Sequence, residues 1–418
     1  MSDTNTIRLG RNAADEKQWA TKEGGLLAAN TKTFTDYADR LTPVEFDVVR
    51  ETTATRVNEL GLIETVAANV PRIDFTNDPK GELLVEPLRT NIETSSSGLD
   101  GSNVGGILDA LGGDSPTSLG NEGVVFTEQT GVSEPFVFLD RTVPNGVNIT
   151  YSIYIKFKSG IPSTRQIKFQ FSDAFTHIVT LNQNGILTNT SGTATSSVTT
   201  LPNGWFRVAF TDLSTTTNLR TIIRIIDNNN NSFTGTGIDV FSFYNRQIEV
   251  GSYATSLIPT DGVAVTRNAD VIQKTSIASL LGDNAGTLYT ELSFLQSDTV
   301  LSLSDNSTNN RVVIGVNSAR KARTEVRLSG VNVFNGGLQT LNLNTYYKIG
   351  LRYAVNNFAS YINGSQESTN TSGETFNIGT LTKVGLDGGS GTPFYGRIRT
   401  LSVYDYALDN TELANITT

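Results

Sequence analysis

The sequence predicts a mainly β protein built as tandem antiparallel β-sandwich modules. Three observations carry this prediction. Charged residues make up only 17% of the chain, its 38 glycines accompany abundant Asn, Ser and Thr, and short apolar or alternating runs recur along it. Such a composition is typical of many short strands joined by polar turns, with few long amphipathic helices. A chain of 418 residues with 37% hydrophobic residues is long enough for roughly two to four domains, each with its own core.

The charge balance and the residue types absent from the chain exclude several classes of protein. A net charge of -9 and a pI near 4.9 argue against nucleic acid as a partner, because that affinity depends on clustered Lys and Arg. The chain has no cysteine, so disulfides and Cys-ligated zinc are excluded. The N-terminus has no apolar signal region, and no stretch approaches the ~18 apolar residues of a membrane span. We therefore expect synthesis in a cytoplasm and no membrane insertion.

Residues 1–50 differ from the rest and are predicted to be an attachment or oligomerisation segment. From Asn12 onward, an Asn cap, early acids and good helix formers precede the stop at Gly24, which favours a short helix. Trp19 is either a packing anchor or a contact that docks onto a neighbouring subunit or a larger assembly. Both roles follow because a short terminal helix without a core of its own must lie on another surface.

Residues 51–122 are predicted to be a β-hairpin region and a connector. Short apolar or alternating runs between Phe46 and Ile92 are separated by Gly, Pro, Asn and Asp, which favours a small set of hairpins. Residues 93–122 are rich in Ser and Gly and are expected to form a loop, with a brief helical turn from Leu108 to Leu111.

Residues 123–273 are predicted to be the first large β-sandwich module. In residues 151–158, the odd-numbered positions are apolar or aromatic, so they face the core, while Tyr154 and the other even-numbered positions face water. The module ends in residues 247–272, where Pro259 and the pair Asp261-Gly262 indicate turns. Similar strand-like runs occur at residues 167–171, 205–210, 221–226 and 240–244.

Residues 274–418 repeat this design and are predicted to be a second sandwich. Asn363-Gly364 is a strong hairpin signal, because both turn residues need positive φ. The last segment, from Asp409 to Ala414, carries the caps of one short helix. The strands are expected at residues 288–294, 300–303, 311–316, 325–328, 346–353, 358–362 and 396–404.

Two stretches of the second module resemble the laminin-G or concanavalin A-like family. The run Ala-Ser-Tyr-Ile-Asn-Gly at residues 359–364 resembles that family's central hairpin, and residues 396–413 resemble its closing strand and helix. The resemblance covers the second module alone and implies a concanavalin A-like lectin fold for it.

Several other stretches resemble bacteriophage structural proteins. The first module resembles their carbohydrate-binding-like jelly rolls, and the resemblance as a whole implies a tail-fibre, spike or head-fibre protein located in the virion. The residues that carry it are Asn-Gly-Trp-Phe-Arg-Val at 203–208 and the segments 55–66, 71–75, 84–91, 246–260 and 265–270.

The sequence lacks the acidic motif of glucanases built on the concanavalin A-like fold. Those enzymes place acids at alternating positions of one strand, so that the nucleophile and the general acid share a face. The acids within residues 291–298 and 405–412 are too widely spaced for that motif, which favours solvated or turn roles. We therefore expect no catalytic residue and no enzyme activity.

The sequence offers little for metal or cofactor binding. His177 is the only histidine, so it cannot build a multi-histidine site, and we expect a surface or hydrogen-bonded strand residue. Two polar loops, residues 227–231 and 385–391, could hold calcium through carboxylate and carbonyl oxygens, although plain turns are favoured. We expect no metal ligand and no cofactor, with calcium left open.

Sugar binding by a sandwich requires aromatic faces for the apolar side of the ring and polar groups for its hydroxyls. Tyrosines expected at exposed strand positions, together with polar residues expected at loop ends, meet this requirement. The candidates are Tyr154, Tyr361, Asn363, Asp387, Tyr395 and Arg397.

Three functions stay open at this point. The favoured one is a non-enzymatic virion structural protein whose N-terminal part docks on other virion proteins or assembles a homotrimer, and whose sandwiches bind host cell-surface carbohydrate. The second is a capsid decoration or baseplate protein without a sugar site. The third, a polysaccharide depolymerase, is disfavoured by the missing acidic motif.

Overall fold

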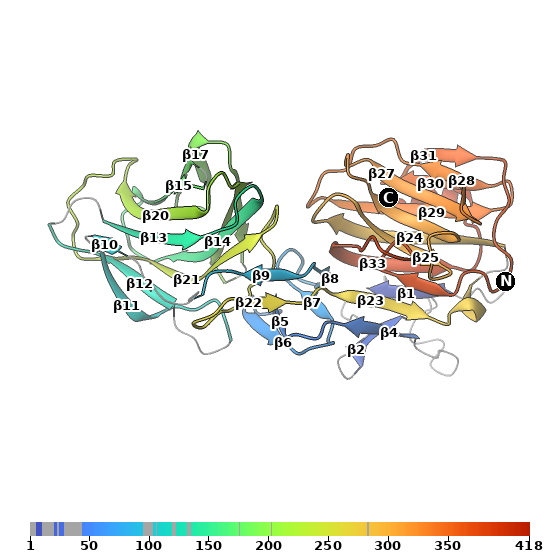
Figure 1. Ribbon diagram of the computed structural model, residues 1–418, viewed down its shortest axis with the longest axis horizontal. Coiled ribbons are helices and arrows are strands. Elements are labelled where there is room, and N and C mark those ends of the chain that lie inside the picture. Colours follow the sequence, from blue (N-terminus) through green and yellow to red (C-terminus); the bar gives the residue numbers. More distant parts are fainter. Residues whose placement is uncertain are drawn as a thin grey trace. The chain divides into compact units, whose positions relative to one another are not determined.

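The computed structural model in Figure 1 confirms the mainly β fold, in which all paired strands of the described residues run antiparallel. The strands form two compact units: unit 1 comprises residues 1–52, 67–87 and 269–418, and unit 2 comprises residues 53–66 and 88–268. The sequence analysis predicted four consecutive domains, and that division remains a prediction. The structure describes residues 6–10, 21–22, 25–28, 44–94, 103–105, 107–118, 123–131, 135–174, 176–201, 203–281 and 284–418.

Unit 1 is a sandwich of two large sheets. The first contains, in order, β31 (Ser365–Asn370), β30 (Phe358–Ile362), β29 (Tyr346–Ala354), β24 (Ala285–Phe294), β33 (Gly396–Tyr404), β8 (Glu82–Val85) and β7 (Arg72–Asp74), with β1 (Thr6–Gly10) also paired to β33. The second contains β2 (Thr21–Lys22), β3 (Gly25–Ala28), β4 (Val44–Val49), β23 (Val271–Thr275), β32 (Lys383–Gly385), β25 (Thr299–Ser304), β26 (Arg311–Val316), β27 (Ala322–Leu328) and β28 (Val331–Gly336). A 3-10 helix, η1 (Ala278–Leu280), follows β23.

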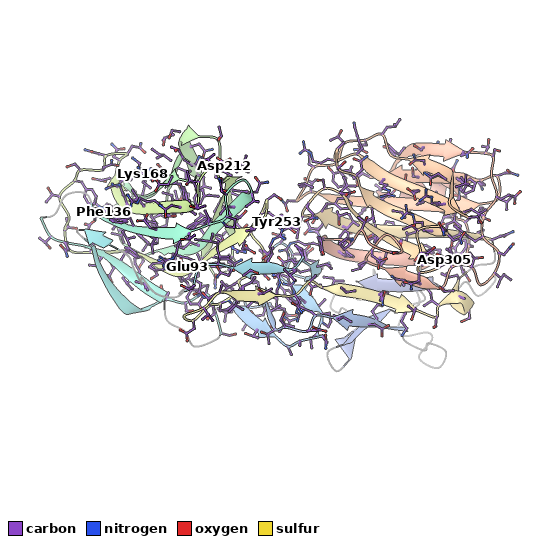
Figure 2. The ribbon with its side chains drawn as sticks, in the orientation of Figure 1. Glu93, Phe136, Lys168, Asp212, Tyr253 and Asp305 are labelled. Atoms are coloured by element: carbon purple, nitrogen blue, oxygen red, sulfur yellow. The ribbon has the colours of Figure 1, made fainter. Side chains whose placement is uncertain are left out.

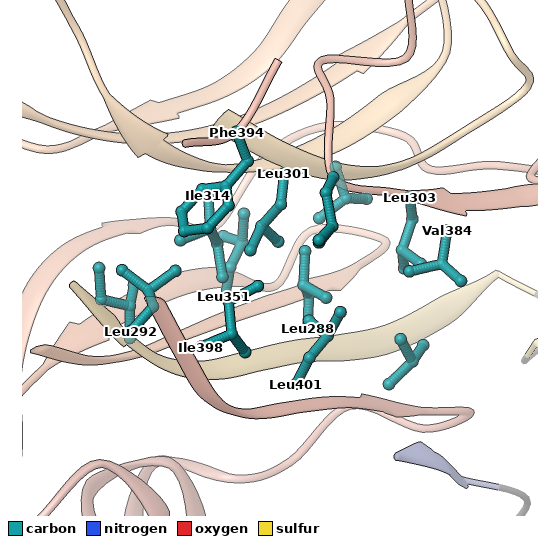
Figure 3. Close-up of a cluster of buried hydrophobic side chains, with 14 of the residues drawn as sticks. Leu288, Leu292, Leu301, Leu303, Ile314, Leu351, Val384, Phe394, Ile398 and Leu401 are labelled. Carbon is teal, nitrogen blue, oxygen red and sulfur yellow. The ribbon is translucent and has the colours of Figure 1, made fainter. Parts of the chain in front are cut away.

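The core of unit 1 lies between these two sheets. Figure 3 shows Leu288 and Leu401 of the first sheet facing Leu303 and Val384 of the second. All four side chains are buried and belong to one hydrophobic cluster. The alternation read from the sequence therefore places one face of each strand in this core, as expected for a sandwich.

Two local predictions in unit 1 are confirmed. Asn363 and Gly364 both have positive φ, 48° and 79°, in the turn between β30 and β31. Helix α1 (Asn410–Thr417) begins with a capping box, in which the Asp409 side chain accepts from Glu412 N and the Glu412 side chain accepts from Asp409 N. Both features depend on short-range chemistry, which a sequence expresses directly.

The N-terminal segment contributes strands to unit 1. β1 pairs with β33, and β4 pairs with β23, so both segments enter the two sheets. The short helix predicted from Asn12 and the assembly candidate Trp19 lie outside the described residues.

Unit 2 is a second sandwich, made of two six-stranded sheets. One contains β10 (Asn103–Gly105), β13 (Phe136–Thr142), β20 (Asn218–Asp227), β15 (Arg165–Asp173), β16 (His177–Leu181) and β17 (Leu187–Gly192). We call it the β20 sheet. The other, the β14 sheet, contains β11 (Ile107–Gly113), β12 (Gly123–Glu128), β21 (Asp239–Val250), β14 (Asn148–Phe157), β19 (Phe206–Leu213) and β18 (Thr195–Thr200).

Two two-stranded sheets complete unit 2. They are β5 (Ala54–Val57) with β6 (Ile63–Val66), and β9 (Arg89–Asn91) with β22 (Val265–Arg267). The helical turn predicted from Leu108 to Leu111 is wrong, because these residues lie in β11 and pair with β12. Tertiary pairing decides the conformation of such a short segment.

Two arginines and two carboxylates form buried polar contacts in unit 1. Arg72 of β7 donates to the carboxylates of Glu86 (2.7 Å) and Asp270, while Arg50 donates to Asp270 at 2.9 Å. All four side chains are buried. Burial by itself lowers the pKa of Arg72, but the charges of Asp270 and Glu86 outweigh it and raise that pKa. These residues therefore join distant segments of the chain inside unit 1.

Candidate functional site

The exposure predicted for Tyr154 and Tyr361 is wrong. Tyr154 is 4% exposed and packs with Trp205 and Leu257, on the side of the β14 sheet opposite to the main core. Residues of the β5–β6 hairpin belong to the same cluster, so the outward phase of the strand is covered. Tyr361 is 5% exposed, packs with Leu413 of α1, and its hydroxyl lies 2.9 Å from Gln366 Oε1.

Two of the polar candidates are engaged in turns. Asn363 is exposed, and its Oδ1 accepts from Lys348 N at 2.9 Å. Asp387 is partly exposed and accepts from Lys383 Nζ at 2.7 Å and from Gly389 N at 2.8 Å. Asn363 thus ties its turn to strand β29, and Asp387 holds its own loop in shape.

The last two candidates lie close together in the sequence. Tyr395 is the residue before β33, and Arg397 lies in β33. Tyr395 is partly buried against the unit 1 core. Arg397 donates from one nitrogen to Asp74 at 2.7 Å and to Glu82 at 2.9 Å. Burial alone would lower the pKa of Arg397, but these carboxylates raise it. The six candidates therefore do not form one site: Tyr154 lies in unit 2, and the other five make separate contacts within unit 1.

The outer face of the β20 sheet gathers side chains that the sequence did not single out. Val137, Ile223 and Ile167 point into the unit 2 core, so the alternate residues of β13, β20 and β15 lie on the opposite face. We call this surface the β20 face and define it by Phe136, Phe138, Lys168, Gln170, Arg220 and Arg224, all partly exposed. Figure 2 labels Phe136 and Lys168 on it.

Strand register sets these side chains in cross-strand rows. Phe136 is opposite Arg224, which is opposite Lys168, which in turn is opposite Thr180 of β16. In the adjacent row, Phe138 is opposite Ile222, which is opposite Gln170. Directly opposed residues have Cβ atoms roughly 5 Å apart, so each row is a continuous strip of side chains.

Aromatic rings and guanidinium groups pack together on this face. The rings of Phe136 and Phe138 are stacked, with centroids 6.2 Å apart and an interplanar angle of 12°. Arg224 lies over the Phe136 ring at 5.0 Å from its centroid, and Arg220 lies over the Phe138 ring at 5.2 Å. Such contacts hold the long arginine side chains in defined positions.

The three cations of the β20 face have different partners. Arg220 makes a two-pronged ion pair with Asp140, both distances being 2.7 Å. Lys168 Nζ donates to the uncharged side chain of Asn231 at 3.2 Å. Within the described part of the chain, neither Arg224 nor Lys168 forms an ion pair, and Arg224 Nε is buried with no hydrogen-bond partner. Two adjacent positive charges therefore have no carboxylate partner among the described residues.

His177 lies in a strand, as expected, but it is buried, so the surface alternative is wrong. It lies in β16 with its ring centroid 6.1 Å from that of Phe210. Burial lowers the pKa of His177, and the charge of Asp212 opposes this effect. The neutral imidazole is thus part of the unit 2 interior.

The loop at residues 227–231 is a tight turn at one end of the β20 face. Asp227 and Asn230 exchange backbone hydrogen bonds of 3.0 and 2.8 Å, and Asn228 and Asn229 have positive φ. Across the described ranges, no three His, Cys, Asp or Glu side chains are grouped so that they could hold a metal ion. In the same ranges, the structure contains no helix with the length and hydrophobicity that crossing a bilayer requires.

The signal for the β20 face was present in the sequence but weak. Phe136-Val-Phe-Leu-Asp alternates, and Arg220 and Arg224 occupy the same phase of one apolar strand. Neither segment shows that its outward residues meet those of the other, since that depends on the pairing of β13 with β20.

Comparison with known proteins supports a lectin-like second module. Residues 266–414 match the family model Laminin_G_3, described as the concanavalin A-like lectin/glucanases superfamily. This agrees with the resemblance read from residues 359–364 and 396–413. No curated protein sequence matches the chain significantly.

Three solved structures with some likeness to this chain are remote in sequence. Domain 4 of the arabinanase AbnA from Geobacillus stearothermophilus, in complex with arabinotriose, is 15% identical with a TM-score of 0.31, covering 36% of this chain and 73% of that one. The CBM22-1 xylan-binding domain of Paenibacillus barcinonensis Xyn10C is 14% identical with a TM-score of 0.24, covering 40% and 94%. Trypanosoma rangeli sialidase in complex with the inhibitor DANA is 11% identical with a TM-score of 0.29, covering 94% and 82%. TM-scores this low give no support to any function.

Proposed function

We propose that this chain is a non-enzymatic, glycan-binding structural protein of a bacteriophage virion, of the tail-fibre, spike or head-fibre type. The β20 face is the observation that carries the glycan-binding part of the proposal. The match of residues 266–414 to a superfamily that contains lectins also supports glycan binding. The virion part rests on the resemblance of segments 55–66, 71–75, 84–91, 203–208, 246–260 and 265–270 to phage structural proteins.

The β20 face has the two kinds of group that a saccharide needs. Phe136 and Phe138 offer partly exposed rings to the apolar C–H surface of a sugar. Arg224, Lys168 and Gln170 offer donors to its oxygen atoms from neighbouring strands. Because these residues lie on paired strands rather than on loops, their spacing is fixed before the ligand arrives.

The non-enzymatic part of the proposal rests on the occupation of the carboxylates in unit 1. Asp74 and Glu82 both bind Arg397, and Glu291 binds Arg399 at 3.1 Å. A glycosidase needs a pair of carboxylates directed at the scissile bond, one of them free to give up a proton. We therefore propose that these acids stabilise the fold, that no cofactor is required, and that binding is the activity.

Host attachment by this face requires several copies. A single sugar site with a Kd near 1 mM corresponds to a binding free energy of about -4 kcal/mol. Linking sites in an oligomer raises the avidity by roughly 10² to 10⁴ without new contacts. We propose a homotrimer, attached to other virion proteins through the N-terminal segment, which presents its units to host cell-surface carbohydrate.

Affinity electrophoresis of the purified chain through gels containing dextran, mannan, alginate or polygalacturonate tests the binding. We expect retardation by at least one polymer and a loss of at least about tenfold in affinity for Phe136→Ala, since one ring of the platform is removed. Phe206→Ala is the matched control, because Phe206 is a partly exposed phenylalanine of the β14 sheet in the same unit. A folded protein that no polymer retards would refute glycan binding.

Labelling of intact phage particles tests the virion part separately. Gold-conjugated antibody against residues 281–418, viewed by electron microscopy, is expected to mark the tail or the head fibres. Particles that carry no label, from a lysate in which the chain is expressed, would contradict the virion location.

A further inference from the structure

Resting on the proposed function, we infer that the β20 face takes a saccharide that carries carboxylate groups, held by Arg224 and Lys168 beside the Phe136 ring. The class of ligand is an acidic polysaccharide built from uronic acid units. The inference starts from the charges of this face rather than from its aromatic rings.

The arrangement of Arg224 and Lys168 is unfavourable in the free protein. They are directly opposed on β20 and β15, and like charges in opposed positions destabilise a sheet. The chain as a whole has a net charge of -9, so carboxylates are plentiful elsewhere. Nevertheless, in the part of the chain that the structure describes, no carboxylate pairs with either cation, whereas Arg220 on the same face is neutralised by Asp140.

The geometry of the two cations suits a carboxylate. The guanidinium of Arg224 is held over Phe136 at 5.0 Å, and its Nε, which is buried, has no hydrogen-bond partner among the described residues. A planar guanidinium matches a carboxylate with two parallel hydrogen bonds. Lys168, steadied by Asn231 at 3.2 Å, can add a charged donor from the next strand. A uronate ring packed on Phe136 would place its carboxylate within this pair.

The test compares the intact chain on polygalacturonate with its methyl-esterified form, by biolayer interferometry at 50 mM and 500 mM NaCl. The two polymers share a backbone and differ in charge. At low salt, we expect the affinity for the acid form to exceed the affinity for the ester by about tenfold. At high salt, we expect the affinity for the acid form to fall, because salt screens exposed charges.

Two variants assign the preference to the cations. Arg224→Gln and Lys168→Gln are each expected to lose about tenfold in affinity for polygalacturonate, with less than about twofold change on the ester. Lys158→Gln is the matched control, since Lys158 is a partly exposed lysine of the same unit beside Asp114 at 3.5 Å. Lys168→Gln is the variant less prone to misfolding, because the hydrogen bond that it removes among the described residues is to the side chain of Asn231.

The outcomes separate this inference from the proposed function. Equal binding of the acid and the ester, unchanged by Arg224→Gln, would overturn the acidic ligand and leave glycan binding intact. Binding of no polymer would overturn both. Tighter binding of sulfated dextran than of polygalacturonate would overturn the carboxylate assignment.

A further variant, Glu134→Gln, is measured on the same polymers, because Glu134 lies outside the described residues. A gain above about tenfold would show that Glu134 already neutralises the pair, and would overturn the inference.

Discussion

Arg397 and Arg399 of unit 1 and Arg224 of unit 2 are strand arginines with opposite ionic surroundings. On β33, Arg397 contacts Asp74 and Glu82, and Arg399 contacts Asp78 at 3.1 Å and Glu291 at 3.1 Å. On β20, Arg224 contacts an aromatic ring and no carboxylate of the described residues. Both strands alternate arginine with core residues, so the sequence pattern is the same. The difference teaches that an arginine on a strand is structural or available for a ligand according to what the paired segments bring to it.

The largest expected effect comes from removing the charge in unit 1. Arg397→Gln removes the cation that binds the buried carboxylates of Asp74 and Glu82, and breaking a buried pair in this way costs about 3–5 kcal/mol. Arg224→Gln removes a charge that has no ionic partner in the described ranges, and it is expected to cost less than about 1 kcal/mol. Urea unfolding followed by circular dichroism measures both. Similar losses in the free energy of unfolding for the two variants would contradict the contrast drawn between Arg397 and Arg224.

A second expected effect is a difference between the two units in how their stability depends on pH. His177 is the only histidine of the chain and lies in unit 2, and burial lowers its pKa below the ordinary value of 6.5. As the pH falls below about 6.5, the unfolded chain binds a proton that the folded unit resists, so unit 2 loses stability by at most about 1.4 kcal/mol per pH unit. Calorimetry from pH 7.5 to 5 should show this slope.

The histidine variant identifies the source of that slope. His177→Gln is expected to flatten it, whatever its effect on the stability at pH 7.5. Glu374→Gln, a change at an exposed acid of unit 1, is the control and should leave the slope unchanged. A slope that persists in His177→Gln would assign the pH dependence to carboxylates instead.

The smallest effect concerns the ion pair on the β20 face itself. Asp140→Asn removes the carboxylate that neutralises Arg220, and should leave the unfolding midpoint nearly unchanged, because surface pairs contribute little. It should also raise the affinity for polygalacturonate by about fivefold or less, since a third cation becomes available on this face. Weaker binding after this change would show that Asp140 itself contacts the ligand.

Local chemistry was readable from the sequence, and long-range pairing was not. The turn at Asn363-Gly364 and the capping box of α1 depend on neighbouring residues, and both were predicted. The partner of Arg397 is Asp74, 323 residues away, so no local pattern could reveal it. Tyr154 follows the outward phase of its strand, yet Leu257 and the hairpin at residues 54–66 cover it. For the same reason, the row of Phe136, Arg224 and Lys168 became visible only once the strand register was known.

The pairing of β1 with β33 determines the order in which the chain can fold during synthesis. All segments of unit 2 have been made once Asn268 has left the ribosome. β1 is made before the other described strands, but the partner of its Thr6 is Tyr404, which is made long after unit 2. At ~5–20 residues per second, β1 waits roughly 7 to 27 seconds after unit 2 is complete. Unit 2 therefore has the opportunity to fold while the strands of unit 1 encoded before it are still unpaired.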